Sequence, residues 1–132
     1  MFELLFDRRH RVLLARFSGT LDGAAVAALD DAAARFVERE GPVSSIADFS
    51  NVETVGMVTD TIVNRGLLPP IMKDQLRVFV VPRDDLYGLA RMFATYQRAS
   101  GNREPVLVRS LDQAYTTLGL VDPDFQPVEP SQ

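Results

Sequence analysis

Short apolar runs recur along the chain, separated by connections rich in polar residues, glycine or proline. The runs have the length and the Phe, Leu, Val and Ile content of β-strands, and they lie at residues 2–6, 11–17, 43–49, 76–81 and 105–109. The first two flank the tight polar connection "DRRH", which predicts an antiparallel hairpin. The run at 76–81 is apolar at nearly every position, as expected of a strand covered on both faces.

Between these runs the apolar positions change to a helical spacing. The spacing predicts helices at residues 24–40, 54–65, 86–100 and 110–118. In the third of these, the inward-facing stripe is expected to consist of Leu86, Leu89, Ala90, Phe93 and Gln97.

Residues that favour helix ends stand where the helices should begin and stop. Asp22, Asp84–Asp85 and Ser110 are expected to bond unpaired N–H groups of a first turn, and Gln113 completes a capping box with Ser110. Gly66 is expected just past the end of the second helix.

The element order is therefore β-β-α-β-α-β-α-β-α, which predicts an α/β fold. Strands that alternate with helices pair in parallel through right-handed crossovers, so we expect a mixed, mostly parallel sheet with the first strand antiparallel. A single domain is expected over residues 1–120, followed by a frayed, acidic, proline-containing tail over residues 121–132.

Charge and composition narrow the function classes. The formal net charge of the 132 residues is -4, which argues against nucleic acid as a partner. The chain has no cysteine, and no run approaches the length of a membrane helix. We therefore expect a cytoplasmic protein without membrane insertion. No nucleotide-binding or hydrolase motif is present, so we expect neither a cofactor nor enzymatic activity.

The chain resembles the STAS-domain superfamily. The likeness is carried by the element order together with "DFSNV" (48–52), "VFVVPRDDLYGLARMF" (78–93) and "PVLVRSLDQAYTTLGL" (105–120). More narrowly, residues 2–120 are similar to the SpoIIAA-like (STAS/SEC14-type) group of small bacterial proteins. The resemblance implies a βα superhelix with most helices on one side of a mixed sheet. It also implies protein–protein interaction in signalling, with lipid-binding CRAL-TRIO domains as structural relatives.

The family's phosphoacceptor serine, which the resemblance places at the start of the second helix, has no counterpart here. Asp48 matches the acidic residue at the end of the third strand, and Gly56, Met57 and Val58 occupy the acceptor region. None of these three carries a hydroxyl group, so we do not expect a phosphorylation switch at this position.

The residues around the end of the third strand are a candidate polar site. Ligands of parallel sheets gather at the carboxyl ends of strands, where the chain places Asp48, Ser50 and Asn51, with Met57 close behind. The alternative is that Asp48, Ser50 and Asn51 bond their own backbone, as Asx and Ser turns do. The second interpretation is the favoured one.

A candidate contact surface combines aromatic, Met and Arg side chains, the types enriched in interface cores. It consists of Leu67, Leu68, Ile71 and Met72 in an apolar loop and of Tyr87, Arg91, Met92 and Tyr96 on the third predicted helix. If these residues are exposed, they form a patch that needs a partner.

Three functions are consistent with these features, and the last in rank is a phosphorylation-controlled switch that uses Ser50, Thr54 or Thr59. The first is a non-enzymatic interaction module that self-associates as a homodimer or binds another protein through the candidate contact surface. The second is a carrier or sensor of a small apolar ligand or lipid, as the CRAL-TRIO likeness suggests. It ranks lower because so short a chain leaves little to roof a lipid-sized cavity.

Overall fold

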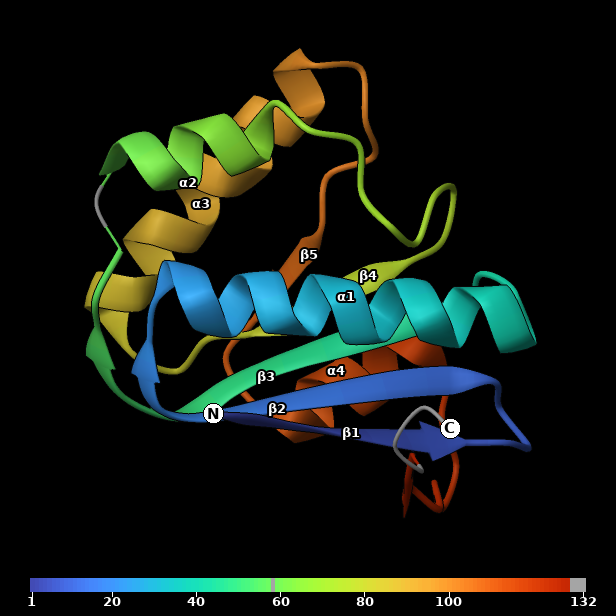
Figure 1. Cartoon of the computed structure of the whole chain (residues 1–132). Coiled ribbons are helices and arrows are strands. Elements are labelled where there is room, and N and C mark those ends of the chain that lie inside the picture. The colour runs from blue at the N-terminus through green and yellow to red at the C-terminus, as the bar shows by residue number, and fades with distance from the viewer. Residues whose placement is uncertain (58, 129–132) are drawn as a thin grey trace.

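The computed structural model describes residues 1–57 and 59–128. Within these residues the chain forms one sheet of six strands in the order β5-β4-β3-β2-β1-β6 (Figure 1). The strands are β1 (Phe2–Asp7), β2 (Val12–Leu21), β3 (Ser44–Val55), β4 (Arg77–Val80), β5 (Val106–Val108) and β6 (Gln126–Pro127). β1 pairs antiparallel with both neighbours, and the other pairs are parallel. The expected mixed, mostly parallel α/β sheet is confirmed, with β6 as an addition.

Four helices in the described part flank the sheet: α1 (Gly23–Glu40), α2 (Thr59–Gly66), α3 (Asp84–Ala99) and α4 (Leu111–Leu118). Helix α1 lies across one face, with α2 and α3 on the same side, whereas α4 lies behind the strands (Figure 1). Asp22 caps α1 by accepting a 2.8 Å hydrogen bond from the Ala25 N–H, and Ser110 caps α4. Both N-cap residues match the sequence expectation, but the Gln113 side chain accepts its hydrogen bond from the Arg109 N–H and not from that of Ser110, so the expected capping box is only half formed.

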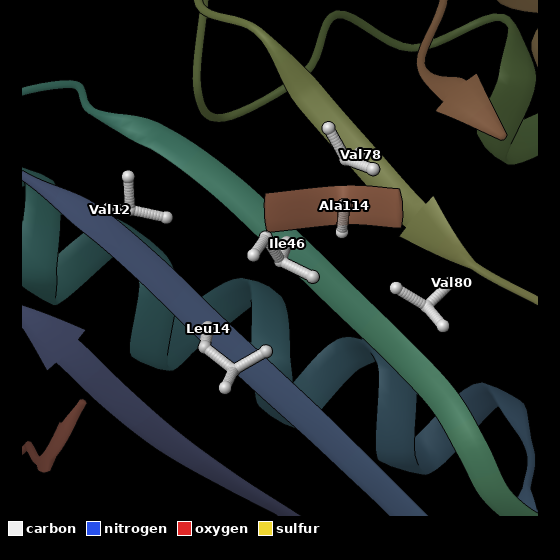
Figure 2. Packing of buried hydrophobic residues seen from close by; sticks show 6 residues of the cluster. All are labelled: Val12, Leu14, Ile46, Val78, Val80 and Ala114. Carbon is white, nitrogen blue, oxygen red and sulfur yellow. The ribbon is translucent and has the colours of Figure 1, made fainter. Parts of the chain in front are cut away.

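The face under α4 is tightly packed. Its buried cluster consists of Val12, Leu14, Ile46, Val78, Val80 and Ala114 (Figure 2). The members of this cluster on β2 and on β4 are every second residue of the strand, because successive side chains of a strand point to opposite faces. Ala114 is fully buried, so its small side chain allows α4 to lie close to the strands. This face leaves no room for a ligand.

The strands β2 and β3 extend beyond the ends that the sequence pattern indicates. Their pairing continues to Leu21 and Val55, with register shifts near Ser18 and Gly19, and Gly19 adopts a left-handed φ of 71°. Such irregularities bend a strand pair, and the ends of β2 and β3 turn towards α2 and α3 (Figure 1). The predicted helix start at residue 54 is therefore wrong, because cross-strand pairing with β2 prevails over local helical spacing.

The end of the chain also differs from its prediction. Residues 121–128 are not a frayed tail, because β6 pairs with β1 and the Asp124 N–H donates a 2.8 Å hydrogen bond to the Asp7 carboxylate. His10 binds the same carboxylate through its backbone N–H and its ring, at 2.8 and 2.9 Å. Residues 129–132 of the predicted tail lie outside the described residues. The domain boundary at residue 120 stays a prediction.

Asp7 is the centre of this contact and is 1% exposed. Burial alone raises the pKa of Asp7, but the hydrogen bonds from His10 and Asp124 outweigh that effect and lower the pKa to about 2. Because the folded-state pKa is below that of the unfolded chain, the ionised carboxylate stabilises the fold above about pH 4. That contribution is lost as the pH falls towards 2.

We expect Asp7→Asn to lower the free energy of unfolding near neutral pH by about 2 kcal/mol and to flatten its decline below about pH 4. Urea unfolding followed by circular dichroism at several pH values measures both effects. Asp31→Asn, at an exposed position on α1, is the control and should leave the pH profile unchanged. Identical profiles for Asp7→Asn and the parent protein would contradict this account.

Helices α2 and α3 approach each other closely at Gly66. A Cβ atom added there would stand 2.5 Å from the Cβ of Tyr96 and 3.3 Å from the carbonyl oxygen of Phe93. Gly66 is the last residue of α2 and not, as expected, the residue beyond it. Gly66 permits the close packing of α2 on α3, and its backbone is not left-handed.

We expect Gly66→Ala to destabilise the protein by about 1–3 kcal/mol, because the added methyl group forces α2 and α3 apart. Gly88→Ala is the matched control: a Cβ there meets nothing within 4 Å, so helix propensity should stabilise the protein by about 0.5–1 kcal/mol. Thermal unfolding of both variants provides the comparison. The packing argument fails if both substitutions stabilise.

Candidate functional site

The sheet face opposite α4 has a cavity of about 270 Å³ between the strands and helices α1, α2 and α3. Its floor is formed by alternate residues of three neighbouring strands: Leu13, Ala15 and Phe17 of β2, Ala47 and Phe49 of β3, and Phe79 of β4. Its walls include Val26, Leu29 and Ala33 of α1, Ile62 of α2, and Leu86, Leu89, Ala90, Phe93 and Gln97 of α3. The inward stripe predicted for the third helix is thus confirmed and lines the cavity.

Small side chains create the space. Ala15 pairs with Ala47, and Ala47 pairs with Phe79, so two alanines lie side by side in the middle of the floor. Ala33 of α1 and Ala90 of α3 are the shortest side chains that these two helices contribute to the cavity lining. Larger side chains elsewhere set the distance between the sheet and the helices. The methyl groups of these alanines are too short to fill that distance, so a cavity remains between the sheet and the helices.

Aromatic rings form a continuous band along one side of the cavity. Phe17 and Phe49 stack with ring centroids 5.1 Å apart, and Phe49 meets Phe79 edge to face at 5.6 Å. Phe79 in turn stacks on Phe93 of α3 at 5.8 Å. Phe49, Phe79 and Phe93 are only partly buried, although they lie under helices. The cavity therefore has an accessible aromatic wall.

An ion pair joins two of the three helices that flank the cavity. Arg65 of α2 lies 2.5 Å from the Asp30 carboxylate of α1, and both residues line the cavity. This contact ties α2 to α1, and its two charges compensate each other.

The end of the cavity near residues 68–72 is polar. Gln97 is fully buried, and its Nε2 donates 2.8 Å hydrogen bonds to the carbonyl oxygens of Gly66 and Leu68. Its Oε1 accepts a 2.9 Å hydrogen bond from Nη2 of Arg77, which also donates to the carbonyl oxygen of Arg103 at 2.6 Å. Burial and, secondarily, the charge of Arg103 lower the pKa of Arg77 to about 10.

The predicted strand-end polar site is not assembled as one cluster. Asp48 is buried, and its Oδ1 accepts hydrogen bonds from the backbone N–H and the hydroxyl of Ser50, at 2.9 and 2.6 Å. Asp48 is two residues from Ile46 in β3 and therefore lies on the same side of the sheet, under α4, whereas Met57 lines the cavity on the opposite side. Asn51 is exposed within β3. The local hydrogen bonds of Asp48 agree with the Asx-turn interpretation.

The predicted contact surface is only partly exposed. Leu67 and Leu68 are 53% and 58% exposed, and Arg91 is exposed as well. Met72 is 5% exposed, because it packs among residues of β1, β2 and α1, so its placement on the surface was wrong. Ile71, Tyr87, Met92 and Tyr96 are partly buried.

One aromatic residue of that surface is covered by a neighbour. The guanidinium of Arg109 lies 3.8 Å from the ring centroid of Tyr87, and it also contacts the Asp84 carboxylate at 2.8 Å. Asp85 binds Arg83 at 2.6 Å. The N-cap residue of α3 is Arg83, which makes no side-chain cap, so neither aspartate occupies the N-cap position. Both lie in the first turn, where Asp85 Oδ1 accepts a 2.8 Å hydrogen bond from the Leu86 N–H, so the expected bond to a first-turn N–H is confirmed for Asp85. Both carboxylates also bind arginines.

Within residues 1–57 and 59–128, no group of three or more His, Asp or Glu side chains could hold a metal ion. No helix in this part of the chain is long and apolar enough to span a membrane.

The sequence pattern did not reveal the cavity. The signal was present in the pairing of two short side chains, Ala15 and Ala47, and in Gln97, a polar residue within an otherwise apolar inward stripe. Recognising it requires the strand register, which aligns Ala15 with Ala47, and local spacing does not give that register.

Comparison with solved structures finds the anti-sigma factor antagonist SpoIIAA in its unphosphorylated form, with a TM-score of 0.58 and 12% sequence identity. The match covers 89% of this chain and 96% of the SpoIIAA chain. No protein-family model and no curated protein matches the sequence. The resemblance expected from the sequence is therefore confirmed at the level of architecture: the chain has the SpoIIAA-like fold.

Proposed function

We propose that the protein is a non-catalytic binding module whose cavity takes up a small apolar molecule. The observation that carries this proposal is the cavity of about 270 Å³, with its alanine floor and aromatic wall. Concave, mostly apolar cavities with few polar groups are the usual form of small-molecule sites. This was the second-ranked function from sequence, and the geometry now supports it better than the first.

The cavity volume limits the size of the ligand. A water molecule's share of liquid volume is about 30 Å³ and a methylene group is of similar size, so the cavity holds on the order of nine non-hydrogen atoms. That fits a short acyl chain or one substituted ring, and it is too small for a two-chain lipid. The proposal is therefore a carrier or sensor of a small molecule.

The partly buried rings give such a ligand its binding energy. Phe49, Phe79 and Phe93 line the cavity and keep part of their surface accessible. Covering apolar surface is worth about 25 cal/mol per Å² removed from water. A bound apolar molecule would complete the packing that the two alanines leave open.

The fold supports the non-catalytic part of the proposal by analogy. The SpoIIAA neighbour is described as an anti-sigma factor antagonist, which suggests signalling through protein contacts. Ligand uptake and a protein partner are compatible, since a filled cavity can fix the positions of α2 and α3.

We expect Ala33→Phe to weaken binding of indole, a neutral fluorescent compound small enough for the cavity, by at least about tenfold, because the phenylalanine ring occupies the cavity. The adjacent Ala34→Phe is the matched control: it adds the same side chain to the same helix at an exposed position. Fluorescence titration gives both dissociation constants, and circular dichroism verifies folding. Failure of the parent protein to bind the probe, or equal loss in both variants, counts against the proposal.

Self-association is a second candidate function, favoured by the exposed neighbours Leu67 and Leu68. Light scattering on a size-exclusion column should show a dimer at tens-of-micromolar concentration (about 10–50 µM). The double variant Leu67→Ser/Leu68→Ser should shift it to monomer. Val121→Ser, at another exposed apolar residue, should not. A monomeric parent protein excludes this function.

A further inference from the structure

Arg77 is a buried cation at the polar end of the cavity. It is 9% exposed and lines the cavity with Ser45, its direct partner across the strand pair. Among residues 1–57 and 59–128, no carboxylate lies within 4 Å of its guanidinium. Buried arginines are normally paired, because an uncompensated charge away from water is costly.

The hydrogen bonds of Arg77 leave part of its guanidinium free for a ligand. Both bonds use Nη2, and neither Nε nor Nη1 bonds to any residue that the structure describes. No fully buried side-chain nitrogen in that part lacks a partner, so these donors border open space. A guanidinium presents its N–H groups as a planar fork that matches a carboxylate.

The second arginine of the cavity shows the contrast. Arg65 is paired with Asp30 at 2.5 Å, so its charge is balanced. Arg77 has instead the neighbouring charge of Arg103, and burial together with that charge lowers its pKa to about 10. Arg77 remains protonated near neutral pH, and a bound anion would offset both unfavourable effects.

The apolar and charged parts of the cavity are adjacent. Arg77 and Phe79 are two residues apart in β4, so they project from the same face of the sheet. Phe79 pairs with Ala47. A chain that starts at the guanidinium therefore extends over Phe79 and the alanine floor.

We propose that the ligand is an amphipathic carboxylate whose short apolar chain fills the cavity while its carboxylate pairs with Arg77. This inference rests on the proposed function and names the ligand class. The chain length follows from the cavity volume of about 270 Å³, which corresponds to a ligand such as octanoate.

Isothermal titration calorimetry with octanoate and with 1-octanol, its neutral counterpart, tests the inference. We expect the parent protein to bind octanoate at least about tenfold more tightly than 1-octanol. In Arg77→Gln, which removes the charge, octanoate should lose that advantage while 1-octanol binding is retained. Arg98→Gln removes an equal charge from an exposed position and should preserve the preference.

The outcomes distinguish failure of the carboxylate assignment from failure of the proposed function. Equal binding of both compounds, or a preference for 1-octanol, overturns the carboxylate assignment and leaves apolar uptake intact. Failure of both compounds and of indole to bind overturns the proposed function and the inference together. The comparison in the parent protein decides the assignment even if Arg77→Gln does not fold.

Discussion

The buried amide of Gln97 holds the site together. Its nitrogen binds the last carbonyl of α2 and the carbonyl of Leu68, and its oxygen binds Arg77 of β4. One side chain of α3 thereby fixes the end of α2, the loop after it and the start of β4. A fully buried amide must have its hydrogen bonds satisfied, so these parts keep a common geometry. The contact at Gly66 and the polar end of the cavity both depend on it.

The two faces of the sheet differ in packing and therefore in what they can do. Under α4, branched side chains fill the space and close it (Figure 2). Under α1, α2 and α3, the strands and the helices both contribute alanines to the cavity lining, and the ion pair between Asp30 and Arg65 joins α1 to α2. The second face also contains buried hydrophobic clusters, around Phe36 and around Phe17, and members of both line the cavity.

Sequence reasoning recovered the element order, the sheet type, the caps at Asp22 and Ser110 and the inward stripe of α3, because each is set by local spacing or local hydrogen bonds. It failed where distant segments decide. Residues 50–55 read as a turn and helix start but pair with β2. Residues 121–128 read as a tail but are anchored by Asp7, a hydrogen bond across 117 positions. Residues 45–55 thus belong to one strand, and the Ser50 hydroxyl donates a hydrogen bond to the Asp48 carboxylate within it.

The cavity could not be predicted for the same reason. Its floor depends on the register that aligns Ala15 with Ala47, and its polar end depends on Arg77 meeting Gln97 from another element. Residue types alone indicated neither. The unpaired charge of Arg77 is likewise visible only once its neighbours are known.

Nuclear Overhauser effects between octanoate and the alanine methyl groups of ¹³C-methyl-labelled protein test the central claim most directly. The account predicts contacts from the octanoate chain to Ala15, Ala47 and Ala90, which line the cavity. The exposed methyl groups of Ala27 and Ala34 should show none. Contacts to the exposed alanines alone, or no contacts to any methyl group at saturating octanoate, would contradict it.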